Sequence, residues 1–580
     1  SYGGVDRRVL HTGGRRVVMS RALQAVAPAL TSYQQLDVTD AGTLDGFLQA
    51  MDDFRQNNVN VLRLEQAAKN IAAMGEEYET QNNHSPQATD AHLHRLSDKI
   101  NDLALIFASY NALCQGKFYD PNDDLTYLAA CMEESGFFVN KHIYFDGFYG
   151  FMPLQIAVVE QMARQAGQMT FAFLDAGKDG AREWMMQRVD RTGKQIEALL
   201  ERAGRTFHVV RFQEDRRIRP QSLTRFSAWG PDVRPIRADT PKICHLHEIR
   251  LVQGSNIWEE AEWLCCDILR RVQTTDCRFR EINIVTRNTD RYAGVLDAAF
   301  EKYQIPYHFS VRQSLMQHSL FRFIDALMRC HTYHCRRQDV LTLIKTGFLP
   351  ISIEDACLFE RYVELWNIQG EGYLNNEDWQ MHPDGLVKDR QDDSEDARLQ
   401  AINRARRVVV EHLQKSFDAF DNLNGAADAS AYLRVLITFL CSLHVPEQLQ
   451  EKAKFYEQMG DRRGRDVTLQ LWQTFCDVTD ELVLTAEGMQ IKPESFFRLL
   501  TLMVADADIG TIPAGLDCVP FSDAALLRAD HCRHIYLIGM TDGAFPQTPP
   551  DNRFFSEWEK EVFAKQCHIE SFADKDQMAA

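Results

Sequence analysis

The amino-acid sequence predicts an α/β protein with two regions of parallel sheet, each interrupted by a large helical region. Three features predict this arrangement. A short apolar strand, residues 143–145, runs into Asp146 and is followed by a glycine-rich turn and an amphipathic helical segment. Alternating strand and helix patterns start again at 248–309. Two more strand patterns, at 518–521 and 534–540, follow a long helical stretch, so a sheet is expected to resume there.

Length and composition indicate the class of protein. With 580 residues the chain exceeds what one hydrophobic core organises, so we expect roughly three to five domains of about 100 to 200 residues. An apolar content of 45% and a charged content of 25% are ordinary for a soluble protein. No apolar run approaches the ~18 residues of a membrane-spanning helix, and Arg7, Arg8, Arg15 and Arg16 exclude a signal peptide.

The cysteines and the net charge indicate the compartment and the partners. Fourteen cysteines are scattered singly, except for Cys265 and Cys266, so we expect buried thiols in a reducing cytoplasm. A net charge of -18 disfavours nucleic-acid binding unless Lys and Arg are clustered. Basic clusters do occur at 202–225 and 462–465, and we interpret them as solvated surface.

Both ends of the sequence suggest a piece of a longer protein. The chain opens at Ser1 rather than Met, and it closes at Ala580 just after a charged run, 574–576, that has a helical pattern. We therefore expect sequence to be missing on each side.

The first half of the chain predicts a helical region followed by a sheet. Apolar residues recur at helical spacing over 43–134, with a polar loop at 76–90. A strand at 169–174 completes a strand–helix–strand unit with residues 143–145, which favours a parallel sheet. A helix, a strand-like stretch and a Pro- and Arg-bearing connector at a domain boundary then follow, at 180–202, 207–212 and 216–241.

The second half repeats this order. Residues 320–504 are predicted to be helical, apart from an acidic, tryptophan-bearing loop at 375–396 that we expect to be a solvated surface. The later strand at 534–540 ends in a turn at 541–543. The alternating strands and helices that precede the helical region are expected at 248–253, 257–272, 282–286, 292–303 and 305–309.

Asp146 is the first candidate site residue, because an open α/β sheet places ligands at the carboxyl ends of its strands. A nucleotide-hydrolysing site of the P-loop class needs such an Asp beside magnesium, followed by a residue that orients water. Gly147 follows instead, and the chain contains no Gly-x-x-x-x-Gly-Lys-Ser/Thr loop to hold phosphates. We expect no ATP hydrolysis here, and capping of the following turn is the alternative role of Asp146.

Two further clusters are candidates for ligand binding. Phe148, Tyr149 and Phe151 could stack on the bases of a single nucleic-acid strand, or they could pack between domains. The segment 330–335, with two Cys and two His, is the strongest metal candidate. Its i,i+4 pairs would lie on helix faces about 100° apart, which disfavours a tetrahedral zinc site, so we expect no bound metal.

Several stretches, taken in order, resemble a known family. They are residues 8–14, 102–110, 143–148, 282–287, 305–307 and 535–546. Together they resemble the B subunit of the bacterial AddAB (RexAB) helicase-nuclease, which is itself similar to the UvrD-like superfamily 1 helicases. The resemblance covers nearly all 580 residues.

The resemblance implies two RecA-like domains, 1A and 2A, with helical insertions 1B and 2B. In chain order the expected segments are a remnant of 1A at 1–20, 1B at 21–136, 1A continued at 137–240, the first part of 2A at 241–335, 2B at 336–505 and the return of 2A at 506–580.

It also implies roles for individual residues. Asp146 and Gly147 resemble a degenerate helicase motif II, which continues from Asp to Glu in active helicases. Arg287 resembles the Arg of motif IV. The residues that resemble motif V, which normally faces nucleotide and DNA, are Gly539, Asp542 and Gly543.

The implied function is a helicase-like scaffold of a bacterial double-strand-break repair and recombination complex, with little or no ATPase activity of its own. It would guide single-stranded DNA, sense a hotspot sequence and bind an AddA (RexA)-like motor subunit. The expected partners are this subunit and single- and double-stranded DNA. The expected location is the cytoplasm, and we expect no membrane association. The family's P-loop would precede Ser1 and its nuclease domain would follow Ala580, so ATP, magnesium and an iron-sulfur cluster are implied for the full-length protein and no cofactor for this chain.

Two other functions stay open. One is an active ATP-dependent DNA helicase whose P-loop was removed by truncation. The other is a protein-protein scaffold without DNA contact, which the net charge of -18 favours.

Overall fold

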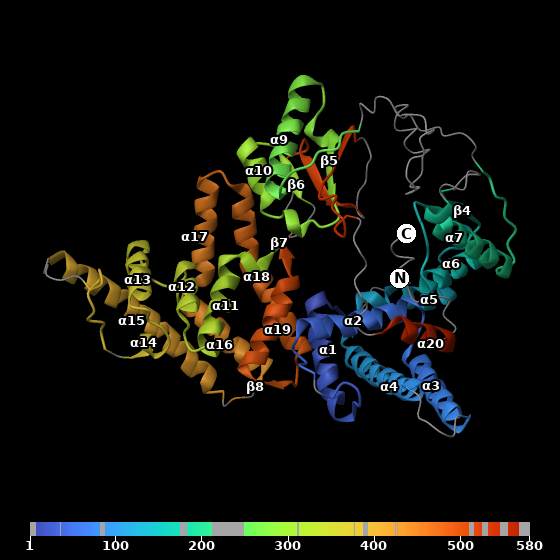
Figure 1. Cartoon of the computed structure of the whole chain (residues 1–580), viewed down its shortest axis with the longest axis horizontal. Coiled ribbons are helices and arrows are strands. Elements are labelled where there is room, and N and C mark those ends of the chain that lie inside the picture. The colour runs from blue at the N-terminus through green and yellow to red at the C-terminus, as the bar shows by residue number, and fades with distance from the viewer. Residues whose placement is uncertain are drawn as a thin grey trace. The chain divides into compact units, whose positions relative to one another are not determined.

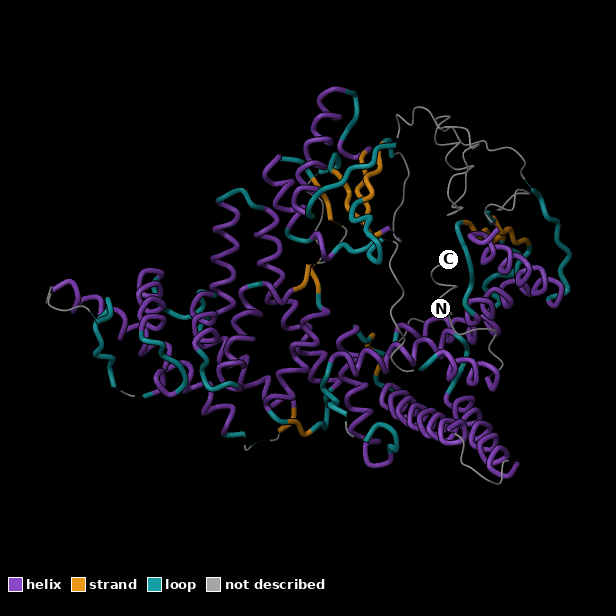
Figure 2. The backbone as a smooth tube through the Cα atoms, viewed as in Figure 1, coloured by secondary structure: helices purple, strands orange, loops and turns teal. Residues whose placement is uncertain are grey.

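The computed structural model shows a protein in which helices predominate and strands are short (Figures 1 and 2). It describes residues 7–34, 36–81, 88–174, 183–211, 249–309, 313–375, 377–386, 393–423, 425, 427–509, 515–524, 532–545 and 555–567.

The chain divides into two compact units, each assembled from separate stretches. The first comprises residues 1–49, 102–120 and 312–512, and the second comprises 50–101, 121–311 and 513–580. Two helices, α2 (Ala41–Gln56) and α4 (Ala88–Cys114), have residues in both.

Helices build the first unit. Its elements are β1 (Arg8–Val9), α1 (Thr12–Val26), the 3-10 turn η1 (Ala27–Ala29), β2 (Phe118–Tyr119), β7 (Gln313–Ser314), η5 (Leu315–Gln317), α11 (Ser319–Thr332), α12 (Arg337–Lys345), α13 (Ile353–Leu365), α14 (Glu371–Leu374), α15 (Asp393–Asp421), β8 (Ala427–Asp428), α16 (Ala429–Ser442), α17 (Val445–Gln458), α18 (Arg462–Thr485), β9 (Gln490–Ile491), α19 (Pro493–Asp506) and β10 (Asp508–Ile509). The helical prediction for 320–504 is therefore confirmed for the described residues. One core joins α11, α13, α16 and α18, which contribute Phe323, Phe359, Tyr432 and Phe475.

The prediction that residues 375–396 form a solvated surface is wrong at Trp379. This side chain is only 7% exposed, and its ring stacks on Tyr362 with 5.2 Å between ring centroids. The indole Nε1 donates to the carbonyl oxygen of Gly372 at 3.1 Å. The acidic residues around Trp379 give no indication that it is buried, because burial of one large side chain requires no local periodicity.

Helix α1 packs closely on α18 and α19 through two glycines. A Cβ added at Gly14 would lie 2.0 Å from Glu481 Oε1, and one added at Gly13 would lie 2.8 Å from the Cα of Met503. The buried Glu481 accepts a hydrogen bond from the backbone N–H of His11 at 2.9 Å, and its other oxygen lies 2.7 Å from His11 Nδ1. Residues 8–14, one of the stretches that resemble the family, therefore pack α1 against α18 and α19 and have a backbone N–H at the helix N-terminus satisfied by Glu481.

A second stretch of the resemblance has an equally structural role. Asp102 on α4 is buried, and its carboxylate accepts backbone N–H groups from Thr31, Ser32 and Tyr33 at 3.0, 2.6 and 3.2 Å. A buried carboxylate is tolerated when such donors satisfy it. Asp102 thus holds the loop after η1.

The second unit contains the remaining elements. These are α3 (Val61–Gln81), η2 (Pro121–Asp123), α5 (Asp124–Ser135), β3 (His142–Asp146), α6 (Pro153–Gln165), β4 (Gln168–Ala172), α7 (Glu183–Arg202), α9 (Ile257–Thr274), η3 (Phe279–Glu281), β5 (Ile282–Thr286), η4 (Asp290–Tyr292), α10 (Val295–Tyr303), β6 (Tyr307–Phe309), β11 (Val519–Asp523), β12 (His534–Leu537) and α20 (Glu557–Cys567).

The predicted strand–helix–strand unit is confirmed. Strands β3 and β4 pair in parallel, with Phe145 opposite Phe171 and Asp146 opposite Ala172, and α6 connects them. Alternate residues of the two strands pack against α6 and α7, where Val159 and Leu199 are buried. The other face of this two-stranded sheet is exposed.

The second predicted sheet is also confirmed. Its strand order is β12-β5-β11-β6, and all neighbouring strands are parallel. Ile284 in the central strand β5 lies opposite Phe521 in β11 and Tyr536 in β12, so the sheet does resume after the helical region. Helices α9 and α10 share one hydrophobic core with it (Figure 1).

Three local predictions are wrong. No strand forms in the described parts of 207–212 and 248–253, where Val210 and Leu251 are exposed; a strand pattern without a partner strand buries nothing. The polar loop at 76–90 is shorter than expected, because α3 runs on to Gln81 and α4 starts at Ala88. The connector at 216–241, the charged run at 574–576 and Asp175 lie outside the described residues.

In the described part of the chain, no single helix is both long and apolar enough to cross a membrane. Helices α16 and α17 meet that criterion only as a pair, by length and composition, and they bend by 52° where they join.

Candidate functional site

The carboxyl end of β3 leads into an exposed loop, residues 147–152. Asp146 is exposed there and forms no hydrogen bond or ion pair with another described residue. Gly147 has a φ of +77°, and nothing lies within 4 Å of the place where a Cβ would stand. A residue with a side chain costs about 1–2 kcal/mol in this left-handed conformation. The backbone itself therefore favours Gly over the Glu of an active motif II.

The aromatic residues of this loop, which we call the aromatic loop, differ in their accessibility. Tyr149 is 59% exposed and makes no ring contact with another described residue. Phe148 is 42% exposed and stacks on Phe151, with 5.0 Å between the ring centroids and 19° between the planes. Phe151 in turn meets Phe145 in the small core of β3 and β4. Tyr149 and Phe148 thus offer ring faces to solvent, and Phe151 supports them.

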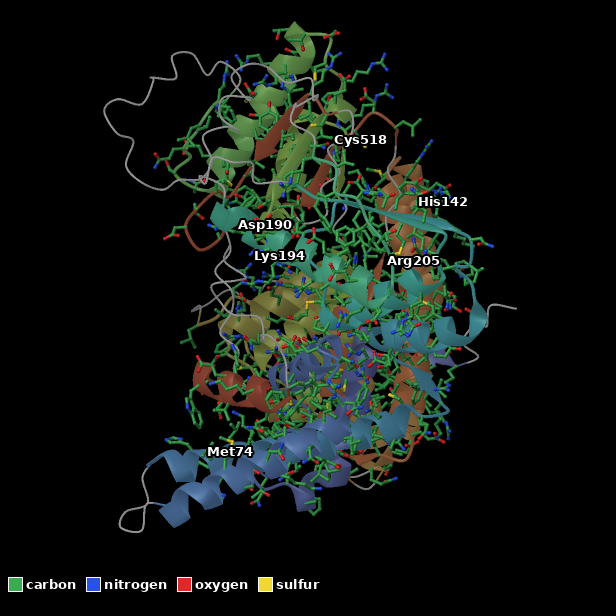
Figure 3. All side chains as sticks on the ribbon, turned by 90° about the vertical axis from the view of Figure 1, so that its right-hand side faces the viewer. Met74, His142, Asp190, Lys194, Arg205 and Cys518 are labelled. Atoms are coloured by element: carbon green, nitrogen blue, oxygen red, sulfur yellow. The ribbon has the colours of Figure 1, made fainter. Side chains whose placement is uncertain are left out.

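Helix α7 holds the aromatic loop. Thr192 Oγ1 shares its proton between the carbonyl oxygen of Arg188 at 2.9 Å and that of Tyr149 at 3.3 Å. A Cβ added at Gly150 would lie 2.8 Å from Arg188 Nε, so the loop backbone and this guanidinium are in close contact. Figure 3 shows the helix with Asp190 and Lys194 labelled on it. The loop is therefore positioned by side chains that come about forty residues later in the chain.

The predicted motif IV residue lies at a different sheet. Arg287 follows β5, and its Nη1 pairs with Asp523 Oδ1 at the end of the neighbouring strand β11, at 3.0 Å. The Arg287 side chain is 40% exposed. Its charge is thus already partly neutralised at the carboxyl edge of the four-stranded sheet.

The predicted motif V residues form one turn after β12. Gly539 has a φ of +69°, and its backbone N–H donates to Glu260 Oε1 at 3.0 Å. The other oxygen of Glu260 accepts the Tyr292 hydroxyl at 2.6 Å; burial and this hydrogen bond raise the pKa of Tyr292. A Cβ at Gly539 would lie 2.9 Å from the Tyr292 hydroxyl oxygen, so only glycine fits. Asp542 and Gly543 follow on the exposed side of the turn.

A second carboxylate on α9 ties the same sheet to its covering helix. Asp267 is buried and accepts hydrogen bonds from Tyr536 Oη at 2.7 Å and Arg271 Nε at 2.8 Å, and it also pairs with Arg270. Burial alone would raise the pKa of Asp267, but these hydrogen bonds outweigh it and lower the pKa to about 2.

Glu260 and Asp267 were not predicted from the sequence, because neither belongs to a motif. One signal was present. They are seven residues apart on α9, so they share the helix face that buries Ala261 and Leu264, and acids on an apolar face need partners.

The metal candidate at 330–335 does not converge. Helix α11 ends at Thr332, and Cys335, with a φ of +53°, turns back into the core beside Cys330, whose carbonyl oxygen accepts its N–H at 2.9 Å. His331 Nε2 instead lies 3.2 Å from Asp421 Oδ1, and His334 is exposed. Across the described residues, no group of three or more His, Cys, Asp or Glu could hold a metal ion.

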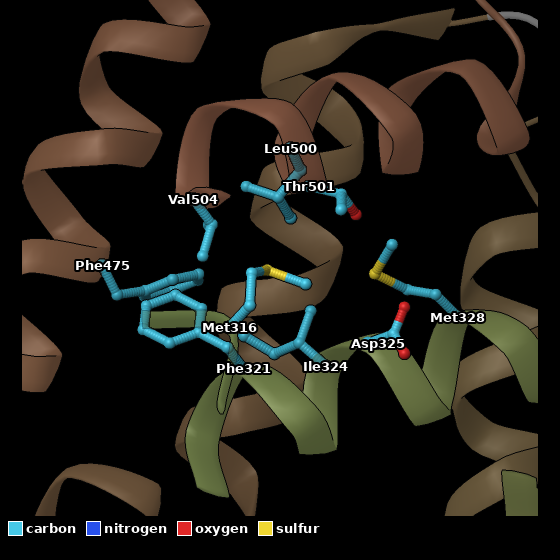
Figure 4. Close-up of a pocket in the computed structure, with 9 residues that line it drawn as sticks. All are labelled: Met316, Phe321, Ile324, Asp325, Met328, Phe475, Leu500, Thr501 and Val504. Carbon is cyan, nitrogen blue, oxygen red and sulfur yellow. The ribbon is translucent and has the colours of Figure 1, made fainter. Parts of the chain in front are cut away.

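A small pocket in the first unit is separate from all of these residues (Figure 4). It is partly open and is lined mainly by apolar side chains such as Met316 and Met328. Asp325 is its one acidic group, and burial raises the pKa of that carboxyl. None of the predicted site residues lines it.

Comparison with known proteins shows which family the chain resembles. Residues 1–225 match the family model described as "ADDB, N-terminal". A curated relative from Acetivibrio thermocellus, named as the B subunit of an ATP-dependent helicase/deoxyribonuclease, is 23% identical over 582 residues, which cover 97% of this chain and 47% of the relative. The chain is thus similar to AddB proteins over nearly its whole length. The family resemblance predicted from the order of its motifs is therefore confirmed.

Other curated proteins to which this chain is similar have the same name. The one from Ruminiclostridium cellulolyticum is 23% identical over 97% of this chain and 47% of its own length. The one from Clostridium acetobutylicum is 23% identical over 80% of this chain and 40% of its own length. This chain thus spans about half the length of the curated relatives it matches.

Proposed function

We propose that this chain is a helicase-like, DNA-binding scaffold of a bacterial helicase-nuclease that acts in double-strand-break repair and recombination. In this role it guides single-stranded DNA, senses a hotspot sequence and assembles with an AddA-like motor subunit. The names of the relatives support the class of complex, since each is called the B subunit of a helicase/deoxyribonuclease.

One observation carries the DNA-binding part of the proposal. At the carboxyl end of β3, Tyr149 and Phe148 present exposed aromatic faces on a loop that is held by α7. Single-strand binding proteins use such rings as platforms, because every base has a face that can stack on them. A base stacked on Tyr149 would need no rearrangement of the core.

The same loop supports the absence of ATP hydrolysis. Gly147 supplies no water-orienting carboxylate, and its positive φ disfavours one. The sequence has no P-loop, so the residues present do not fit the phosphates of ATP or the magnesium that would accompany them. The described thiols also do not fit an iron-sulfur cluster, which needs four converging cysteines.

The four-stranded sheet supports a second helicase-like domain. Arg287 and the turn at Gly539, Asp542 and Gly543 come from different strands yet lie at one carboxyl edge, which is where the motifs of RecA-like domains meet their ligands. We propose that the two sheets are the RecA-like domains 1A and 2A, and that the helical stretches are 1B and 2B.

The decisive experiment is a titration of a short fluorescent single-stranded DNA with this chain across a salt series. The proposal expects the logarithm of the binding constant to fall linearly with the logarithm of the salt concentration. It also expects Phe148→Ala and Tyr149→Ala to bind the DNA more weakly. Absence of binding at low salt would overturn the DNA-binding role. Hotspot sensing requires, in addition, that one short sequence binds more tightly than its scrambled version.

A protein-protein scaffold without DNA contact is the second candidate. The net charge of -18 favours it, because phosphates are repelled by a negative surface. It predicts no DNA binding at any salt concentration, together with intact association with the motor subunit.

A further inference from the structure

Helix α7 separates its charges into two flanks. At 100° per residue, the positive side chains Arg188, Arg191 and Arg202 fall within an arc of about 60°, whereas Lys194 lies outside this arc, close to the direction of Glu201. The acidic side chains fall within a separate arc of about 40°. They are Asp190, Glu197 and Glu201. The buried side of the helix, which packs on β3 and β4, contains Ile196 and Leu199.

The basic flank is the one beside the aromatic loop. Arg188 touches the backbone of Gly150, and Thr192, on the adjoining strip of the helix, donates to the carbonyl oxygen of Tyr149. The acidic residues point about 140° to 180° away from Arg188. Positive charge is therefore placed next to the exposed rings, and negative charge is kept away from them.

The basic side chains of this flank are not committed to other contacts. Arg188, Arg191 and Arg202 are exposed, and none forms an ion pair with another described residue. On the neighbouring helix α6, by contrast, such a pair does form, between Glu160 and Arg164. Exposed guanidinium groups in a row beside aromatic rings are the two components of a single-strand binding surface.

We propose that the basic flank of α7 binds the phosphodiester backbone of the single strand whose bases stack on Tyr149 and Phe148. This inference rests on the proposed function and assigns the phosphate contacts that the aromatic loop cannot supply. The strand runs along the helix, where Arg188 and Arg202 are about 21 Å apart along the axis. Because phosphate contacts are the same for every base, this flank contributes affinity but no sequence preference.

The test replaces Arg188 and Arg191 together by Ala in the 580-residue chain and titrates a fluorescent oligothymidine across a salt series. The loss of two phosphate contacts is expected to weaken binding roughly tenfold at low salt and to reduce the slope of log K against log salt by roughly 1.4. Arg188→Lys with Arg191→Lys should restore the slope of log K against log salt, since the DNA phosphates interact with the positive charge itself.

The matched control removes the same charge elsewhere. Arg434→Ala with Lys454→Ala changes two exposed, unpaired basic residues of the first unit, and it should leave both affinity and slope within error. Equal effects of the two double variants would overturn the proposal, because net charge alone would then explain them.

The outcomes separate this inference from the proposed function. If the unaltered chain binds no single-stranded DNA, both fail. If it binds, and the Arg188/Arg191 variant binds as tightly and with the same slope, only the flank proposal fails. In that case retained DNA binding with weakened association to the motor subunit would assign the flank to an acidic protein surface instead.

Discussion

Two carboxyl edges of parallel sheet in this chain differ in how far their polar groups are satisfied. At the four-stranded sheet, Arg287 pairs with Asp523, and the Gly539 N–H is bound by Glu260. At the two-stranded sheet, Asp146 and Tyr149 face solvent without a side-chain partner among the described residues. Equivalent topological positions can thus be closed largely by internal contacts or left open for a ligand.

The largest expected effect tests the sheet that has the closed edge. Asp267→Ala should lower the free energy of unfolding by roughly 3 kcal/mol, because it leaves Arg271 and Tyr536 without their buried partner. Urea denaturation followed by intrinsic fluorescence measures this. The control is Asp276→Ala, an exposed acid paired with Arg533, for which the loss should stay below about 1 kcal/mol. Similar losses for both variants would contradict a closed, buried network.

Acid should weaken the attachment of α9 to the same sheet. The pKa of Asp267 is lowered to about 2 from its ordinary value of 3.8, so the unfolded state binds more protons between these values. The stability that Asp267 contributes is therefore complete above about pH 4 and is lost as the pH falls through 2. Comparison with Asp267→Asn in acid titrations isolates this contribution, and identical pH profiles would exclude it.

The next effect tests the open edge. Tyr149→Ala should weaken binding of single-stranded DNA by about 1–3 kcal/mol, the usual range for one base stacked on an aromatic ring. Unfolding should barely change, because the ring is 59% exposed. Fluorescence anisotropy gives the affinity, and Tyr149→Phe, which keeps the ring, should bind like the parent chain. A large loss of stability would mean that Tyr149 is part of the core rather than of an open edge.

A smaller effect tests the reason for Gly147. Gly147→Glu recreates the Asp-Glu pair of motif II, but at a φ of +77° it should cost about 1–2 kcal/mol of stability without producing ATP turnover. Gly147→Ala should show nearly the same loss, since the backbone conformation causes it. DNA-stimulated phosphate release in the Glu variant would contradict this account.

The smallest effect is expected for Arg287. Arg287→Ala removes a half-exposed ion pair with Asp523, which is worth about 0–1 kcal/mol. Affinity for single-stranded DNA should fall less than in Tyr149→Ala, because the guanidinium is already engaged. Asp523→Ala sharpens the comparison: if it frees Arg287 for phosphate, binding should tighten slightly in the same anisotropy assay.

Much of the fold was predictable because it is local. Apolar periodicity placed β5 and α9 almost to the residue, and the alternation of strand and helix predicted parallel pairing of β3 with β4. Failures occurred where local pattern and burial disagree. Residues 207–211 have a strand-like pattern but no partner strand among the described residues, and Trp379 is buried inside an acidic loop.

The candidate site was predictable only in its position. Asp146, Gly147 and the aromatic residues were identified because they follow a strand, and Arg287 because it resembles the Arg of motif IV. Whether their side chains are exposed or paired was not predictable. Phe151 supports Phe148 instead of facing solvent, and Arg287 is paired. The basic flank of α7 could have been found by plotting its charges around a helix, but nothing in the sequence says that this flank adjoins the aromatic loop.

The sequence by itself determined the α/β class, the parallel sheets, the absence of a P-loop and the family resemblance, since each of these depends on residues within a short window or on their order. The tertiary structure decided which strand ends are closed and which are open. The closing partners are 236 residues away for Arg287 and 279 residues away for Gly539. A hydrogen bond acts over about 3 Å in space whatever the separation along the chain, so such partners leave no local pattern to read.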